Sequence, residues 1–142
     1  MDGKAIGEIA GEIEDELIAL RRAIPRQPEL AGDGRHTAAL VAERLRAAGL
    51  VVSTGVGGHG VVAVPEGAGA GPVVAYRADM DAVDDDEAFD GAFASRVPGA
   101  AHLCGHDLHT AIGVGIAEVL ARLREYVNGA DRFPLPACRR DP

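Results

Sequence analysis

The sequence contains no tryptophan, and aromatic residues make up only 4% of its 142 residues. A core must therefore be built mainly from alanine, valine, leucine and isoleucine. Only two cysteines are present, Cys104 and Cys138, which is too few for the disulfide framework of a small secreted domain. No apolar run approaches the roughly 18 residues of a membrane-spanning helix, and the first residues lack the layout of a signal peptide. We therefore expect a cytoplasmic protein with no membrane segment.

Basic residues are also in short supply, with 14 lysines and arginines against 22 acidic residues and a net charge of -8. A face that binds nucleic-acid phosphates or an anionic membrane must be basic, so we expect neither partner. Hydrophobic residues make up 47% of the chain, which is typical of globular proteins. The length is enough for one domain with a sizeable core.

Apolar residues recur at every third or fourth position in three segments, which predicts three amphipathic helices. The first covers residues 6–24 and is ended by Pro25. The second covers residues 37–48. The third covers residues 108–126, with Asp107 as the expected N-cap.

Three short β-branched runs lie between the second and third helices and predict strands at residues 50–53, 61–64 and 73–76. The glycine- and proline-rich residues 65–72 are the expected hairpin between the last two strands. The segment from Asn128 onward has three prolines and no periodicity, so we expect it to lie outside the core. The order helix, helix, strands, helix predicts an α/β layer arrangement.

The densest cluster of side chains able to bind a metal lies just before the third helix. Cys104 and His106 stand two residues apart, so that a thiolate and an imidazole can face one cation, and Gly105 permits the tight turn between them. Asp107 could cap the helix or accept a ring N–H from a ligating histidine. Two ligands are fewer than a zinc site needs, and a polar turn that merely caps the helix is the alternative.

A second candidate cluster follows the expected strand at residues 73–76. Alternation along an extended chain puts Asp79 and Asp81 on the same side, and open α/β sheets bind ligands at the carboxyl ends of their strands. The alternative is a solvated acidic loop, which is our interpretation of the acidic residues 84–90.

Residues 77–82 read Arg-Ala-Asp-Met-Asp-Ala, and residues 102–111 read His-Leu-Cys-Gly-His-Asp-Leu-His-Thr-Ala. Arg21-Arg22 and the Pro-Glu-Leu of residues 28–30 precede them. Together these motifs resemble metal-dependent amidohydrolases and metallopeptidases of the aminoacylase–carboxypeptidase type, in the branch of hippurate and auxin-conjugate hydrolases. The resemblance implies part of a zinc-peptidase-like catalytic domain, a three-layer α/β/α fold.

By this resemblance, two divalent metals (zinc, manganese or cobalt) activate a water that attacks the amide of an N-acyl amino acid or peptide. Cys104 and His106 match metal ligands. Asp81 matches the catalytic carboxylate that supports the metal site. The residues expected near the site are Asp79, Asp107 and His109, where Asp79 replaces a ligating histidine of relatives outside this branch.

The chain departs from the family pattern after Phe133. Relatives continue with a strand that reads approximately Arg-Phe-Leu-Phe-Gln-Pro-Ala-Glu-Glu, in which the first glutamate is the general base and the second a metal ligand. One codon choice for residues 134–140, read one nucleotide later, encodes Leu-Phe-Gln-Pro-Ala-Glu. We therefore infer a frameshift, so that residues 1–133 belong to the catalytic domain and residues 134–142 are an out-of-frame tail.

Such a chain lacks the general base, several metal ligands, the C-terminal strands and the smaller domain through which relatives dimerise. We expect it to be truncated and inactive and to bind metal weakly or not at all, with a homodimer only for the complete protein. Whether this chain alone is an enzyme is left open by the sequence. The alternatives are a non-catalytic metal-binding module and an α/β domain whose partner supplies the missing strands.

Overall fold

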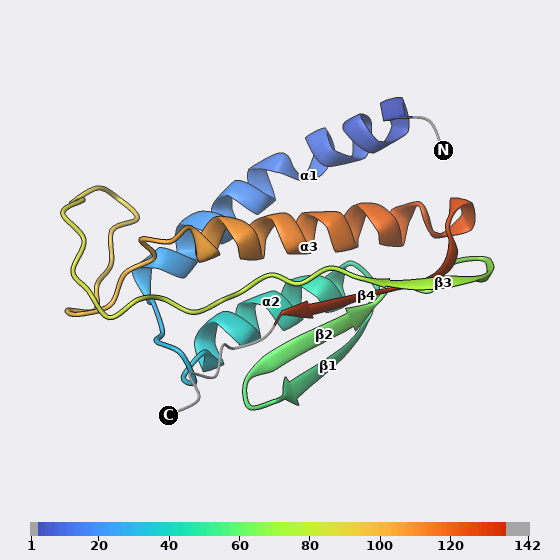
Figure 1. Ribbon diagram of the computed structural model, residues 1–142. Helices are drawn as coiled ribbons and strands as arrows, with labels where there is room; N and C mark the ends of the chain where they lie inside the picture. Colours follow the sequence, from blue (N-terminus) through green and yellow to red (C-terminus); the bar gives the residue numbers. More distant parts are fainter. Residues whose placement is uncertain (1–2, 136–142) are drawn as a thin grey trace.

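The computed structural model describes residues 3–135, and the side chains of residues 3–129. Its elements follow the order helix, helix, three strands, helix, strand, which confirms the expected α/β class. Figure 1 shows the helices lying along a small sheet, with helix α1 (Gly3–Ala23) farthest from the strands. Within this described part of the chain, no helix is both long and apolar enough to cross a membrane.

The helices form where the apolar spacing predicts them. Helix α1 is followed by a short 3-10 turn at Ile24–Arg26, and the other two helices are α2 (Arg35–Ala47) and α3 (His106–Arg122). The Glu29 carboxylate accepts hydrogen bonds of 2.8 Å from two backbone amides in the first turn of α2, those of His36 and Thr37. These amides have no partner within the helix, so the Pro-Glu-Leu motif has a structural role as the cap of α2.

Four strands form one sheet in the order β1-β2-β4-β3. They are β1 (Val51–Val56), β2 (Gly60–Val64), β3 (Gly69–Ala75) and β4 (Asn128–Leu135). Strand β4 runs antiparallel to β2 and parallel to β3, and so lies inside the sheet. Strands β1 and β3 are therefore its edges.

Two expectations about the strands are wrong. Residues 65–72 do not form a hairpin, because β4 separates β2 from β3, and the hairpin instead joins β1 to β2. The segment from Asn128 is expected outside the core, yet as far as Leu135 it forms a central strand. Local composition cannot reveal a strand that is stabilised by neighbours distant in the sequence. The rest of the expected tail, residues 136–142, lies outside the described residues.

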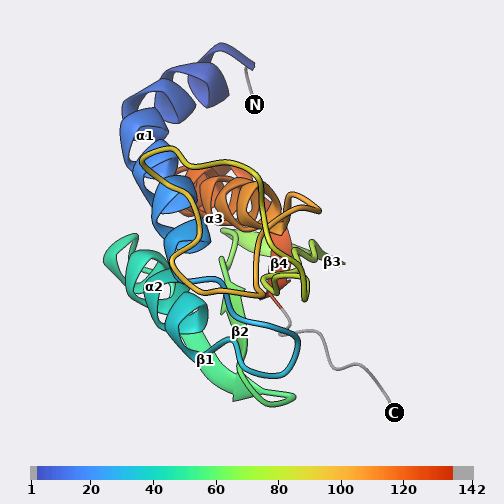
Figure 2. The same cartoon turned by 90° about the vertical axis from the view of Figure 1, so that its left-hand side faces the viewer.

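The core lies between the sheet and the helices α2 and α3. Alternate residues of β2, Val61 and Ala63, are fully buried in one cluster with Val41 and Leu45 of α2 and Val114 of α3. Figure 2 shows α2 and α3 beside the strands, with α1 packed outside α3. The opposite face of the sheet is less covered by other elements, as Val51 of β1 shows with 74% of its surface exposed.

One ion-pair network connects the three helices. Arg44 of α2 binds Glu118 of α3, with 2.8 Å between Nη2 and Oε2, and also binds Glu16 of α1. The Glu118 side chain is only 4% exposed. Its hydrogen bond raises the pKa of Arg44 above the ordinary value, although burial acts in the opposite direction.

We predict that Arg44→Met lowers the free energy of unfolding by roughly 2–4 kcal/mol, because it leaves a buried carboxylate without its partner. The matched control is Arg122→Met, which breaks the exposed pair between Arg122 and Glu12 and changes stability by less than about 1 kcal/mol. Urea denaturation measures both. Equal effects of the two substitutions would show that the buried network contributes nothing particular.

Candidate functional site

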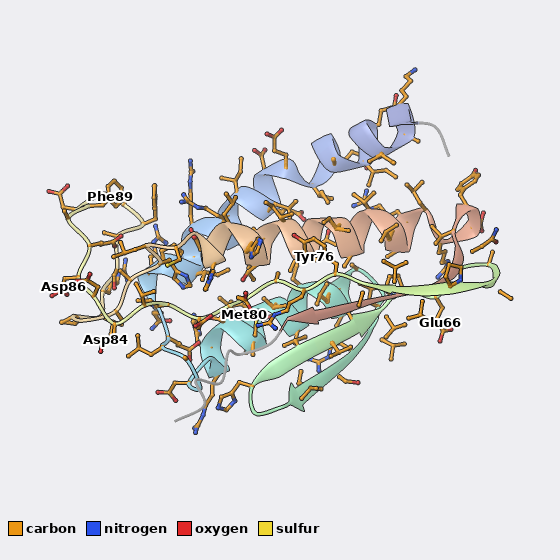
Figure 3. All side chains as sticks on the ribbon, in the orientation of Figure 1. Glu66, Tyr76, Met80, Asp84, Asp86 and Phe89 are labelled. Atoms are coloured by element: carbon orange, nitrogen blue, oxygen red, sulfur yellow. The ribbon has the colours of Figure 1, made fainter. Side chains whose placement is uncertain are left out.

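Three segments meet at one end of the molecule, at the left of Figure 1: the end of α1, the extended chain after β3, and the start of α3. Along the extended chain Ala78 and Met80 are buried, whereas the side chains of Asp79 and Asp81 are 25% and 15% exposed. This alternation places the two carboxylates on the side away from the core. Figure 3 labels Met80 on this segment.

An acidic loop over residues 84–99 follows the extended chain. Asp84, Asp86 and Phe89 lie on it at the far left of Figure 3, and all three are exposed. The Asp86 carboxylate accepts a 2.7 Å hydrogen bond from the amide of Gly99, and the Glu87 carboxylate accepts one from the amide of Ser95. These bonds close the loop on itself, as in the solvated acidic loop that the sequence indicates.

His106 and Asp81 are brought together at the start of α3. The His106 Nδ1 atom lies 2.9 Å from the Asp81 backbone oxygen and 3.0 Å from its Oδ1. Both neighbours are acceptors, so Nδ1 carries the proton and donates to the backbone oxygen. The Nε2 lone pair is therefore available, and this atom has no hydrogen-bond partner among the described residues.

The turn before α3 differs from the expectation in one respect: its N-cap is Gly105 and not Asp107. Gly105 has φ = 78°, the left-handed region that favours glycine, and its carbonyl accepts the 3.0 Å hydrogen bond from the amide of His109. Asp107 lies in the first turn and is 3% exposed, with 2.9 Å between its Oδ2 and Arg21 Nε. Its carboxylate therefore meets a guanidinium of α1, while the backbone oxygen of Asp81 accepts the ring N–H of His106.

The other expected residues lie on the same extended chain, in the turn before α3 and in its first turn. The Cys104 thiol is free and exposed in the turn. The exposed His109 ring stacks beside His106, with 6.4 Å between ring centroids. The Asp79 carboxylate binds Arg77, with 2.8 Å between Nη2 and Oδ1, and its backbone oxygen accepts the Thr110 hydroxyl at 3.1 Å.

Sequence reasoning missed His102 as a separate site residue. Both of its ring nitrogens are buried and have no hydrogen-bond partner among the described residues. Burial lowers the pKa of His102 below its ordinary value, against the opposing charges of Asp107, Asp81 and Glu87. The lowered pKa favours the uncharged form of the His102 ring. The signal in the sequence that points to His102 is its position in the motif of residues 102–111, two residues before Cys104.

Within the described residues, no three histidine, cysteine, aspartate or glutamate side chains are grouped closely enough to hold a metal ion. The local structure thus offers one imidazole nitrogen with a fixed direction and one exposed thiol. These donor types suit a divalent cation, but within the described residues they are fewer than the three or four protein ligands of a zinc site.

We predict that Gly105→Ala lowers the free energy of unfolding by about 1–2 kcal/mol, because alanine is disfavoured at positive φ. Open space surrounds the added Cβ, so the backbone is the cause. The control is Gly11→Ala, which is also in open space but lies inside α1. This substitution raises the free energy of unfolding by roughly 0.5–1 kcal/mol. Chemical denaturation compares the two variants. An unchanged free energy of unfolding in Gly105→Ala would contradict the claim that the turn requires glycine.

Residues 75–130 match the sequence model of peptidase family M20/M25/M40. Thermostable carboxypeptidase 2 of Saccharolobus solfataricus is 41% identical over 131 residues, which are 92% of this chain and 33% of the relative. An N-acyl-L-amino acid amidohydrolase of Geobacillus stearothermophilus is 38% identical over 133 residues, 94% of this chain and 36% of the relative. The chain spans about a third of the length of these curated relatives.

A solved structure shares the fold. The Bacillus subtilis YXEP protein, described as a dinuclear metal binding peptidase from the M20 family, superposes with a TM-score of 0.84 at 34% sequence identity. The match covers 88% of this chain and 35% of that one. Sequence and fold agree with the motifs around Asp81 and His106, and the chain belongs to peptidase family M20/M25/M40.

Proposed function

We propose that this chain contributes part of the metal centre of an amidohydrolase that cleaves the amide bond of N-acyl amino acids or small peptides. The observation that carries the proposal is the contact between His106 and Asp81. It fixes one ring nitrogen and leaves the other to a cation, beside the thiol of Cys104. A carboxylate or carbonyl behind a ligating histidine is the usual support of a catalytic metal.

The donors present fit a divalent cation such as zinc, manganese or cobalt, because all three accept mixed thiolate, imidazole and carboxylate ligands. Cys104 and His106 would hold the cation, and Asp81 would orient the histidine. A bound pair of metals would supply an activated water at neutral pH. Asp79 would add negative charge near the site, and His109 would cover it from the first turn of α3.

The chain alone is proposed to be inactive and to bind metal weakly. Fewer than three donors converge among the described residues, whereas catalytic zinc sites have three protein ligands and an open position. The missing ligands, the general base and a dimerising domain would belong to the complete protein. A cytoplasmic location would suit the free Cys104 thiol, because reducing conditions keep thiols available.

We also propose a frameshift after Phe133, because the next reading frame, for one choice of codons, encodes the Leu-Phe-Gln-Pro-Ala-Glu that relatives have there. Pro134 is compatible with strand β4 as it stands. It pairs with Val62 of β2, whereas the pairs between β4 and β3 end at Arg132, so its missing N–H removes no pair to β3.

The exposed edge favours a second candidate function, a domain that pairs with another polypeptide. Each residue of β3 is exposed, and its outer side pairs with no strand within residues 3–135. Val73 and Val74 are 59% and 58% exposed. A partner would add its own strand at this edge. Co-purification of this chain with a downstream polypeptide from the same gene region would favour this reading.

The hydrolysis test compares the chain as given with a chain extended in the alternative frame. We expect metal-dependent release of the free amino acid from an N-acetyl amino acid by the extended chain only. His106→Ala lowers this activity by about 100-fold or more, because a metal ligand is lost. The matched control is His59→Ala, which removes a histidine hydrogen-bonded to Arg35. Turnover by the chain as given would refute the proposal that it is inactive alone. Turnover by the extended chain in the presence of a chelator would refute the proposal that hydrolysis depends on a metal.

The nucleotide sequence after the codon for Phe133 tests the frameshift. We expect the next frame to encode Leu-Phe-Gln-Pro-Ala-Glu-Glu and to continue with further histidines. A frame interrupted by stop codons would contradict the frameshift and would strengthen the partner-binding alternative.

A further inference from the structure

The last turn of α1 reaches the turn that carries Cys104 and His106. Arg21 Nε lies 2.9 Å from Oδ2 of Asp107, whose side chain is 3% exposed. A buried carboxylate needs such a partner, because an ion removed from water is strongly destabilised when it is left alone. The pair therefore fixes where the first turn of α3 sits against α1.

Asp107 follows His106 directly, so a shift of the backbone at Asp107 also moves His106. On the other side of His106 stands Gly105, at φ = 78° and with open space where a side chain would project. A glycine with open space around it restrains the chain weakly. The turn therefore needs restraint from outside: Asp81 acts on the ring, and Arg21 acts on the helix.

Arg21 also touches the acidic loop. Its guanidinium carbon lies 5.1 Å from the centre of the Phe93 ring, within the range of a cation–π contact, and Phe93 packs on Phe89 with 4.8 Å between ring centroids. The next residue, Arg22, contacts the same ring at 5.9 Å. No ion pair joins Arg22 to Asp107 among the described residues. The two arginines thus share the loop contact and differ in the contact to α3.

We propose that Arg21 is a positioning residue for the metal-ligating turn, acting through Asp107 to hold His106 where Asp81 accepts its Nδ1 proton. The inference rests on the proposed function of Cys104 and His106. It gives a role to the Arg21-Arg22 motif, which the metal chemistry itself does not use. Arg21 contacts Asp107 and the Phe93 ring, so its proposed effect reaches His106 through the geometry of the turn.

The competing explanation is that Arg21 merely ties α1 to α3. The chain contains a natural comparison, because Arg122 of α3 pairs with Glu12 of α1 at 2.7 Å, farther from the turn. If Arg21 only joins the two helices, loss of either ion pair should have the same effect on the turn before α3. If Arg21 positions the turn, only loss of the Arg21–Asp107 pair should change it.

The test reads the turn without any metal. Nitrogen NMR of the histidine rings, at about pH 8 where imidazoles are neutral, reports which nitrogen of His106 carries the proton. Amide hydrogen exchange of His109 reports the first hydrogen bond of α3, the 3.0 Å bond to Gly105. The variants are Arg21→Met and Arg21→Lys, with Arg22→Met and Arg122→Met as matched controls.

We expect Arg21→Met to mix the two His106 tautomers and to speed exchange at the His109 amide by about tenfold or more, since a charged hydrogen bond to a buried group is lost. Arg21→Lys restores part of both signals, and the two controls change neither. If Arg21→Met does not fold, Arg21→Gln takes its place, since glutamine keeps a hydrogen-bond donor but loses the charge. An unchanged His106 tautomer in the folded uncharged variant, or equal effects in Arg122→Met, would overturn the inference.

Failure of the proposed function would look different. In that case the chain extended in the alternative frame would show no metal-dependent hydrolysis, while the His106 tautomer still depended on Arg21. The two readouts therefore separate a wrong function from a wrong role for this arginine.

Discussion

The hydrogen bond from His106 Nδ1 to the backbone oxygen of Asp81 is the interaction on which the site depends. It joins the first turn of α3 to the chain that leaves β3, and it decides which ring nitrogen is free. The remaining structure keeps these two segments in place. Met80, next to Asp81, is fully buried in the core between α2, β2 and α3. The Thr110 hydroxyl adds a second link to the Asp79 carbonyl.

Much of this arrangement could be predicted from the sequence, because its signals are local. Apolar spacing gave the helices, and alternation gave the common side of Asp79 and Asp81. The long-range partners could not be predicted. Strand β4 lies inside the sheet, although the three prolines and the lack of periodicity in residues 128–142 suggest a tail. Asp107 meets Arg21 of α1 instead of capping its own helix. Such choices are made by packing between distant segments, which no local pattern encodes.

The chemistry of the described residues is partial in a specific way. One donor, His106, is oriented by a neighbouring segment, while the other, Cys104, stands exposed in the turn. His102, two residues before Cys104 in the chain, has both ring nitrogens buried and unpaired within the described residues. Buried polar atoms without partners are uncommon in folded proteins. These unpaired nitrogens belong to the same sequence motif in which the family resemblance places metal ligands.

The most direct test of the central claim is cobalt binding by this chain, followed by absorbance spectroscopy. Thiolate coordination produces a charge-transfer band in the near ultraviolet. We predict a weak-affinity band that is present in the unaltered chain and in Cys138→Ser and is absent in Cys104→Ser, because Cys104 is the proposed ligand. No band at any cobalt concentration, or a band that survives Cys104→Ser, would contradict the assignment of a metal centre to this turn.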